Sequence, residues 1–416
     1  MRALFQNVTF RRLFIGRLLS NAGDSLYYIG AMALVYDLGG SVVYTGLAGF
    51  LTLFPQALQF LTGPLVDRWS LRRVLVWSQL FQGLVVLVIP IVYWTGQLTI
   101  TVVLVVMPIV AMASQFVYPA QSAALPRIVA EDELVSANSA FSTAYQGTDA
   151  AFSALGGVLI AIFSPITAFV FDVLSFLGTG LLFGSLSIPP ADEAPSSTGE
   201  QPSYRTRLLD GLNYVRGTVL VAFIGVAAFV NGLLAAAMAV LPAFADGVGG
   251  SSAYGLLLAG LTSGLLLGAL SAEPAKRFSL SRLIVVGFTF GGCCWLAGVA
   301  IHWLPATVVL FCCSLVPAGI TNVLLSAIVQ THVPEPLVGR VSSIMGSASV
   351  IAMPIGSLSG GLLGELWGVQ TVIAGGGIAM IGLAVLWAGH PRLRTLGPIE
   401  ALDPQRYGLT NSSLSP

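Results

Sequence analysis

Twelve apolar segments, each long enough to cross a lipid bilayer, follow one another along the chain. A membrane-spanning helix needs about 20 mainly apolar residues. The segments that meet this requirement are residues 14–37, 44–65, 73–94, 99–125, 137–162, 166–188, 218–243, 253–272, 282–303, 306–330, 338–363 and 368–389. Only 9% of the 416 residues are charged, whereas soluble proteins carry about 25%. The sequence therefore predicts an all-α membrane protein with twelve transmembrane helices.

The positions of the basic residues support this topology. All 18 lysines and arginines lie at the start of the chain, in every second loop, or after the last segment. The alternate loops, around Gly39, Thr95, Ser164, Gly249, Pro305 and Gly364, contain none. Because basic residues are retained in the cytoplasm, we expect both termini on the cytoplasmic side of the cell (inner) membrane. The 18 acidic residues balance the charge, so nothing indicates a nucleic-acid partner.

The single lysine constrains the energy source. Lys276 follows Ala275, whereas a nucleotide-binding P-loop needs Gly-Lys-Ser/Thr. A transporter with this sequence would therefore draw its energy from an ion gradient or from a partner protein, and we expect no cofactor. The four cysteines form no cluster with histidine, which argues against a metal site. The chain also lacks the HExxH, GxSxG and GxGD patterns, so an intramembrane enzyme or a non-transporting sensor is only a remote alternative.

A polar stretch divides the twelve segments into two sets of six. Residues 189–202 read as a flexible linker. In residues 204–216 the apolar side chains share one helical face and the arginines oppose it, as in an amphipathic helix on the inner leaflet. Residues 67–73 align without gaps to residues 276–282, and such parallel repeats are typical of rocking transporters. The predicted parts are an N-terminal bundle (1–188), a cytoplasmic linker (189–217), a pseudo-symmetric C-terminal bundle (218–391) and a cytoplasmic tail (392–416).

A motif between segments 2 and 3 identifies a family. Residues 63–73 (Gly-Pro-Leu-Val-Asp-Arg-Trp-Ser-Leu-Arg-Arg) resemble motif A of the major facilitator superfamily, G-x-L-x-D-R-x-G-R-R, with Ser70 where the family usually has glycine. Residues 14–36 and 125–139 resemble the drug-exporter branch of macrolide efflux and enterobactin exporters. The resemblance implies a monomeric secondary transporter that works by alternating access.

The same resemblance implies a conformational latch. Asp67, at the cytoplasmic end of segment 2, can meet the positive N-terminus of segment 11 and so stabilise the outward-facing state. The residues of this latch would be Gly63, Asp67, Arg68, Arg72 and Arg73. The alternative is that these arginines only orient the protein. Segment 5 retains only Gly156 and Gly157 of the antiporter motif of related exporters, and segment 4 lacks their internal arginine, so the motifs support antiport only in part.

Few ionisable residues fall inside the predicted helices. Asp24 lies near the middle of segment 1, Asp149 near the middle of segment 5, and Asp172 in segment 6, nearer the outer surface. A carboxylate at mid-bilayer costs about 2.5–3.5 kcal/mol and indicates a functional site by default. We expect Asp24 to carry the coupling proton, with Asp149 as the second candidate and Arg17 on the face of Asp24. The alternative is a structural role for each carboxylate.

Polar residues on the remaining faces suggest a substrate cavity. The family lines its cavity mainly with segments 1, 4, 7 and 10, and the candidates are Asn21, Tyr27, Gln56, Gln59, Gln115, Tyr118, Tyr145, Gln146, Asn231 and Asn322. Uncharged amides and aromatic rings around one acid suit a bulky substrate that is apolar or cationic. Each of these residues could equally hold neighbouring helices together.

Glycines repeat every four residues in segments 8 and 11, at Gly260, Gly264, Gly268, Gly356, Gly360 and Gly364. Such stripes either let the two bundles slide on one another or let helices pack closely within one bundle. Taken together, the sequence predicts a proton-coupled exporter of drug-like or secondary-metabolite molecules. A facilitator or importer of a small nutrient on the same fold is the alternative.

Overall fold

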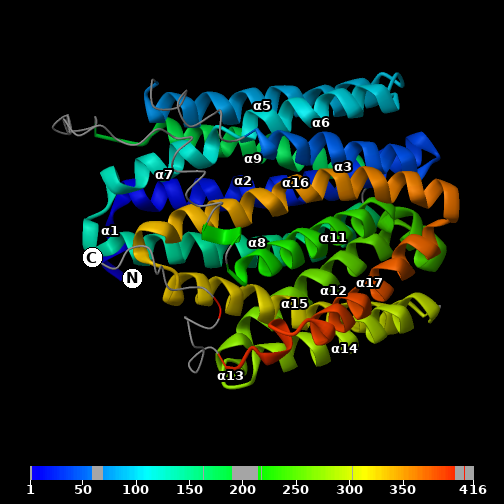
Figure 1. The fold of residues 1–416 in the computed structure, drawn as a ribbon. Coiled ribbons are helices and arrows are strands. Elements are labelled where there is room, and N and C mark those ends of the chain that lie inside the picture. Colours follow the sequence, from blue (N-terminus) through cyan, green and yellow to red (C-terminus); the bar gives the residue numbers. More distant parts are fainter. Residues whose placement is uncertain are drawn as a thin grey trace. The chain divides into compact units, whose positions relative to one another are not determined.

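The computed structural model describes residues 2–58, 69–162, 164–189, 214–216, 218–301, 303–398 and 407. Within these ranges the chain is helical and contains no strand (Figure 1). Each of the twelve predicted segments falls on a helix, and nine of the described helices are long and apolar enough to cross a membrane. The predicted all-α membrane fold is confirmed.

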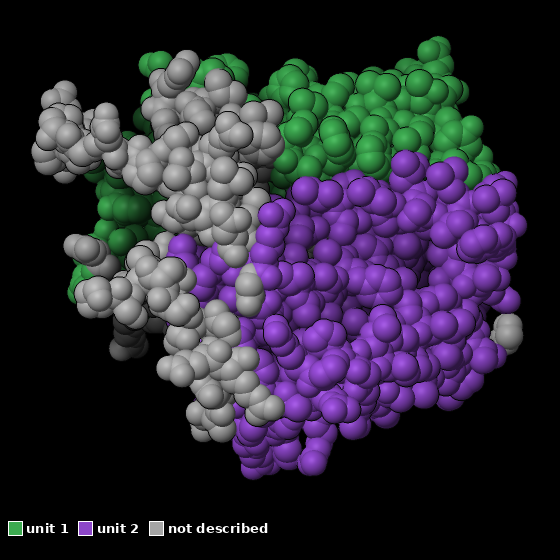
Figure 2. Space-filling model, viewed as in Figure 1, with its two compact units in different colours: residues 1–198, 249–258 green, residues 199–248, 259–416 purple. Residues whose placement is uncertain are grey.

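The helices gather into two compact units (Figure 2). Unit 1 comprises residues 1–198 and 249–258, and unit 2 comprises residues 199–248 and 259–416. The main helices that lie wholly within unit 1 are α2 (Val8–Gly39), α3 (Val42–Ala57), α5 (Leu71–Trp94), α6 (Ile100–Ser114), α7 (Val117–Ile128), α8 (Leu134–Ile162) and α9 (Pro165–Gly184). Of the predicted amphipathic helix, only residues 214–216 lie within the described part of the chain, and they are helical.

The remaining main helices are α11 (Leu220–Gly249), α12 (Ser251–Leu270), α14 (Leu280–Ala300), α15 (Leu304–His332), α16 (Glu335–Trp367) and α17 (Val369–Gly389). Short helical turns are α1 (Arg2–Gln6), η2 (Glu131–Glu133), α13 (Ala272–Ala275) and η3 (Leu393–Thr395). The first residues of α12 belong to unit 1 and its residues from Ala259 onward to unit 2.

Capping fixes both ends of α2. The Asn7 side chain accepts hydrogen bonds from the backbone N–H groups of Thr9 and Phe10, at 3.0 and 3.1 Å, as a preferred N-cap residue does. Its Nδ2 donates to the carbonyl oxygen of Ile128 at 2.7 Å, which ties α2 to the end of α7. The helix ends at Gly40, whose φ of +64° is the left-handed conformation that favours glycine.

Three glycines bring α2 close to α9. Gly16, Gly23 and Gly30 follow one another at intervals of seven residues and all face α9. A Cβ atom at Gly16 would lie 2.6 Å from Phe183, and one at Gly30 would lie 2.9 Å from the Cβ atom of Ala168. Because small residues allow two helix backbones to approach, α2 and α9 pack closely at these three positions.

In unit 2, the predicted glycine stripes also serve helix packing. A Cβ atom at Gly264 would collide with the carbonyl group of Cys312 on α15, and one at Gly360 with the backbone of Ala236 on α11. Gly260 and Gly268 meet α15 in the same way, and Gly356 meets α11 at Gly232. Gly364 is buried on α16. These contacts fit close packing within one bundle, the second of the two interpretations.

Segment 4 differs from the single helix that the sequence predicts. The helix is interrupted after Ser114, and α7 begins at Val117. The N–H group of Gln115 bonds to the carbonyl of Met112, three residues back, instead of four, which is the tighter 3₁₀ pattern. The Nε2 group of the Gln115 side chain donates to the carbonyl of Ala111 at 2.9 Å. This hydrogen bond satisfies a backbone acceptor one turn before the interruption.

The C-terminal tail packs against the start of α14. The N–H groups of Leu280 and Ser281 donate to the carbonyls of Gly397 and Leu396, at 3.1 and 3.2 Å. These bonds satisfy donors that every helix N-terminus leaves without an internal partner. The Tyr407 hydroxyl donates to the carbonyl of Thr395 at 2.9 Å, so the described part of the tail folds onto unit 2.

Large apolar side chains cover the outer faces of the helices. Leu84 on α5 and Leu181 on α9 are 66% and 78% exposed, and Leu386 on α17 is 73% exposed. Soluble monomers rarely present contiguous apolar surface of this kind. The faces are suited to the hydrocarbon core of a bilayer, where α-helices satisfy their own backbone groups.

Candidate functional site

A polar cluster joins α2, α7 and α8 in unit 1. The Arg17 Nε group donates to Gln121 Oε1 at 2.7 Å and to the Tyr145 hydroxyl at 3.0 Å. The Tyr145 hydroxyl donates in turn to Gln121 Oε1 at 2.5 Å. The guanidinium carbon of Arg17 also lies 5.3 Å from the centre of the Tyr145 ring, within the range of a cation–π contact. The cluster therefore holds a half-buried cation with hydrogen bonds and an aromatic face.

Asn21 and Asp24 continue the same face of α2. Asn21 Nδ2 donates to the Tyr145 carbonyl at 3.4 Å, so Asn21 touches the cluster directly. Asp24 is half-buried, and its Oδ2 accepts from the Ser20 hydroxyl at 3.5 Å. Arg17, on the face of Asp24, is directed to Gln121 and Tyr145.

Asp172 on α9 lies beside Gly23, the residue that precedes Asp24 on α2. A Cβ atom at Gly23 would collide with Asp172 Oδ1 and with the Ser175 hydroxyl. Asp172 is 0% exposed, and Asp24 directly follows Gly23 on α2. The close approach of α2 and α9 places Asp172 level with Gly23. The depth of Asp172 in the membrane stays a prediction.

The hydroxyl of Tyr27 is part of this buried region. Tyr27 is 5% exposed, and its ring meets that of Phe169 edge to face, with centroids 5.5 Å apart. Tyr27 lies one turn of α2 after Gly23, the residue that packs on Asp172. Within the described part of the chain, its hydroxyl has no hydrogen-bond partner. A polar group buried in this way is costly unless a partner is supplied.

Two arginines of motif A, Arg72 and Arg73, lie within the described residues and have different neighbours. Arg72 donates to the carbonyl of Gly184. Arg12, which is not part of motif A, donates to the adjacent carbonyl of Ser185 at 2.9 Å. Both cations thus bind carbonyls at the end of α9, where the helix dipole is negative. Arg73 lines a pocket described below. The other predicted latch residues, Gly63, Asp67 and Arg68, lie outside the described residues, so the latch stays a prediction.

Several other candidates are only partly described. Gln59 lies outside the described residues, as do the side chains of Asp149 and Gln146, although α8 includes both of the latter positions. Gly156 and Gly157 also lie on α8. The roles assigned to these residues stay predictions.

A pocket of about 280 Å³ in unit 2 contains two predicted cavity residues. Asn231 on α11 and Asn322 on α15 both line it, together with Ser326 and Gln330. Asn231 Nδ2 donates to the carbonyl of Ala227 on its own helix at 2.8 Å, which orients the amide. None of the described lining residues is charged, so this wall offers neutral hydrogen-bonding groups.

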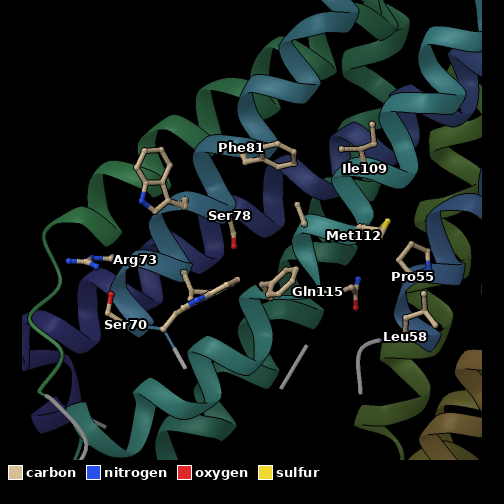
Figure 3. A pocket seen from close by; sticks show the side chains of 14 residues that line it. Pro55, Leu58, Ser70, Arg73, Ser78, Phe81, Ile109, Met112 and Gln115 are labelled. Carbon is tan, nitrogen blue, oxygen red and sulfur yellow. The ribbon is translucent and has the colours of Figure 1, made fainter. Parts of the chain in front are cut away.

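A second pocket, of about 980 Å³, lies in unit 1 between α3, α5 and α6. In Figure 3, Ser70 and Arg73 lie toward one side of it and Pro55 and Leu58 toward the other, with Phe81 and Met112 between. Gln115, a predicted cavity residue, lines this mainly apolar pocket. The other candidates of these helices, Gln56 and Tyr118, are exposed.

We expect the variant Tyr145→Phe to lower the free energy of unfolding by about 1 kcal/mol. The substitution removes a hydroxyl that both accepts from Arg17 and donates to Gln121, and a single such bond contributes about 0.5–1.5 kcal/mol. Thermal unfolding in detergent measures the change. Tyr93→Phe is the control, because Tyr93 is 46% exposed on α5. Equal stability of the two variants would show that the hydrogen bonds of the Tyr145 hydroxyl do not stabilise the fold.

The geometry agrees with comparisons to known proteins. A family model described as transmembrane secretion effector, a group within the major facilitator superfamily, matches residues 2–405. The chain belongs to this family. The predicted resemblance to the superfamily and to macrolide efflux exporters is thus confirmed.

Relatives of this transporter include named efflux pumps. It is 25% identical to the multidrug efflux pump Tap of Mycolicibacterium fortuitum, over 92% of this chain and 96% of that one. It is 21% identical to macrolide efflux protein A of Streptococcus pyogenes, over 91% and 94% of the two chains. Among solved structures, an inward-facing bacterial homologue of the lysosomal transporter Spinster matches with a TM-score of 0.70, 13% identity and coverage of 97% and 98%. The last likeness concerns the fold alone.

Sequence reasoning missed one member of the polar region of this transporter, Gln121, and did not predict the neighbour of another, Asp172. Gln121 was overlooked because the interruption after Ser114 prevents helical periodicity from being carried from α6 into α7. The neighbour of Asp172 was missed as well, although a signal was available. Glycines 16, 23 and 30 recur every seven residues in the first segment, and this spacing indicates one helix face that packs closely on a neighbour.

Proposed function

We propose that this transporter exports drug-like or secondary-metabolite molecules in exchange for protons, by alternating access. The observation that carries the proposal is Asp24, a half-buried carboxylate in the middle of α2 that directly follows Gly23, the residue packed on the buried Asp172. An ionisable group at that depth suits binding and release of a proton. The names of the relatives Tap and macrolide efflux protein A support export. The proton gradient would be the energy source, with no further cofactor.

The proposed transporter works as a monomer in the inner membrane, with both termini in the cytoplasm. The lipid bilayer surrounds its apolar outer faces, and a small molecule is its substrate. The neutral amides of Asn231 and Asn322 favour an uncharged or cationic molecule over an anionic one, because an anion requires compensating cations in a desolvated cavity.

The experiment that tests this proposal is a substrate panel in inverted vesicles with an imposed pH gradient. When the vesicle interior is acidic, we expect a substrate to accumulate inside while protons leave, which a pH-sensitive dye records as interior alkalinisation. Collapse of the gradient with an ionophore should stop the accumulation. If substrates equilibrate without any proton movement, the transporter is a facilitator, and the proposal is wrong.

We further expect the variant Asn231→Ala to raise the KM for transport about tenfold with little effect on folding. One lost hydrogen bond to a desolvated substrate corresponds to about 1.4 kcal/mol. Asn138→Ala is the matched control, because the Asn138 side chain also bonds to a carbonyl of its own helix, that of Leu134, and lies outside the pocket. Equal KM values for both variants would remove Asn231 from the substrate site.

A further inference from the structure

The contact between α2 and α9 contains an acidic group that the proposed function has not yet used. Asp172 is 0% exposed, and the backbone of Gly23 closes over its Oδ1 atom. The Ser175 hydroxyl lies 3.3 Å from Oδ1 and donates at 2.8 Å to the main-chain oxygen of Asp172. Among the described residues, Oδ2 has no hydrogen-bond partner.

The ionisable groups around Asp172 provide no described compensating cation. From α2 it is faced by Gly23, and the titratable residues of α2 nearest to Gly23 are Asp24 and Tyr27. From α5, Gly83 packs against this part of α9, at Val173 and Phe176. Helix α8 also packs on α9 and carries Asp149, whose side chain lies outside the described residues.

Arg17 is the cation nearest to this site along α2, but it donates to Gln121 and Tyr145. An anionic Asp172 would therefore be a desolvated charge beside a second carboxylate, and both conditions favour its neutral form. A proton on Oδ2 removes the charge and converts the unpartnered acceptor into a donor. The Tyr27 hydroxyl, which is 5% exposed and lacks a described partner, adds a second polar group to the same enclosure.

We propose that Asp24 and Asp172 bind one proton between them, and that this proton rests on Asp172. This inference rests on the proposed proton coupling and names the site at which the proton is held. Asp24 is only half-buried and accepts from Ser20, so it is the member that remains an anion. The proton reaches Asp172 from water through Asp24, and its release leaves two carboxylates and one hydrated proton.

The site also links protonation to the packing of two helices. Without the proton, two negative charges would meet where Gly23 lets α2 approach α9 most closely, and their repulsion would separate the helices. With the proton bound, the contact is neutral. Movement of α2 relative to α9 would thus depend on whether the site is occupied, as a coupled transporter requires.

The test is infrared spectroscopy of the full-length protein in lipid nanodiscs at neutral pH. A protonated carboxyl group shielded from water gives a separate C=O stretching band. We expect one such band in the wild type, its loss in Asp172→Asn and its retention in Asp24→Asn. Absence of the band from the wild type, or its survival in Asp172→Asn, would overturn the inference. Loss in Asp149→Asn with retention in Asp172→Asn would assign the proton to α8 and overturn it as well.

A second variant tests the same assignment. Instead of removing the carboxyl group, the variant Asp172→Glu keeps it and extends the side chain by one methylene. We expect the C=O band of Asp172→Glu to persist at a shifted frequency, because the carboxyl group then has different surroundings, and a band of unchanged frequency would contradict the assignment. These readouts are independent of transport. Vesicles that move no protons would therefore refute the proposed function, whereas proton-coupled transport with a band unaffected by Asp172→Asn would refute only this inference.

Discussion

Replacing Asp24 with asparagine is expected to reduce gradient-driven accumulation of substrate to the level of vesicles without the transporter. The amide is nearly isosteric with the carboxyl group but does not bind and release a proton in this pH range. The carboxylate of Asp24 is half-buried on the face of α2 that carries Asn21, beside Asp172. If this carboxylate transfers the coupling proton, the amide that replaces it prevents the pH gradient from driving substrate transport.

Exchange of labelled for unlabelled substrate is expected to persist in Asp24→Asn, because exchange at equal concentrations needs no net proton movement. Both activities are measured in the same inverted vesicles, with and without an acidic interior. Asp246→Asn is the matched control, since Asp246 is an exposed carboxylate near the end of α11 and its loss should change neither activity. Full pH-dependent accumulation by Asp24→Asn would remove Asp24 from the coupling mechanism.

The positions of the helices could be predicted because hydropathy acts locally along the chain. A segment such as residues 282–303 must be helical in a bilayer, since no other open structure satisfies its backbone groups, and α14 occupies residues 280–300. Asn231 and Asn322 could be placed in one cavity for a similar reason, since the family resemblance assigned their helices to its lining.

The pairing of side chains across helices could not be predicted in the same way. Periodicity assigns a residue to a face of its own helix but does not say which helix that face will meet. The partnership of Asp172 with Gly23, and that of Arg17 with Gln121, both depend on such pairings. The interruption after Ser114 is different, because it has a local signal that the sequence analysis did not use. Pro119 has no N–H group to bond to the carbonyl of Gln115, four residues back, so the helix cannot continue regularly there.

The glycine stripe of α12 leads to the prediction with the largest effect on folding. In an ordinary helix, replacing glycine with alanine stabilises the helix by about 1 kcal/mol. At Gly264 the added Cβ atom would collide with the carbonyl of Cys312, a backbone group that no change of rotamer can move. We expect Gly264→Ala to lower the free energy of unfolding by about 1–3 kcal/mol, as overpacking does. The double variant with Gly268→Ala should yield little folded protein.

Gly382→Ala is the control, because a Cβ atom at Gly382 on α17 would meet nothing within 4 Å. Both variants add the same methyl group to an apolar helix of unit 2, so a difference in thermal unfolding isolates the contact with α15. The expected shifts have opposite signs: lower stability for Gly264→Ala, and unchanged or higher stability for Gly382→Ala. Equal stability of the two variants would mean that α12 and α15 do not approach at Gly264. The stripe would then be available to the contact between bundles, where a methyl group should slow transport and leave stability unchanged.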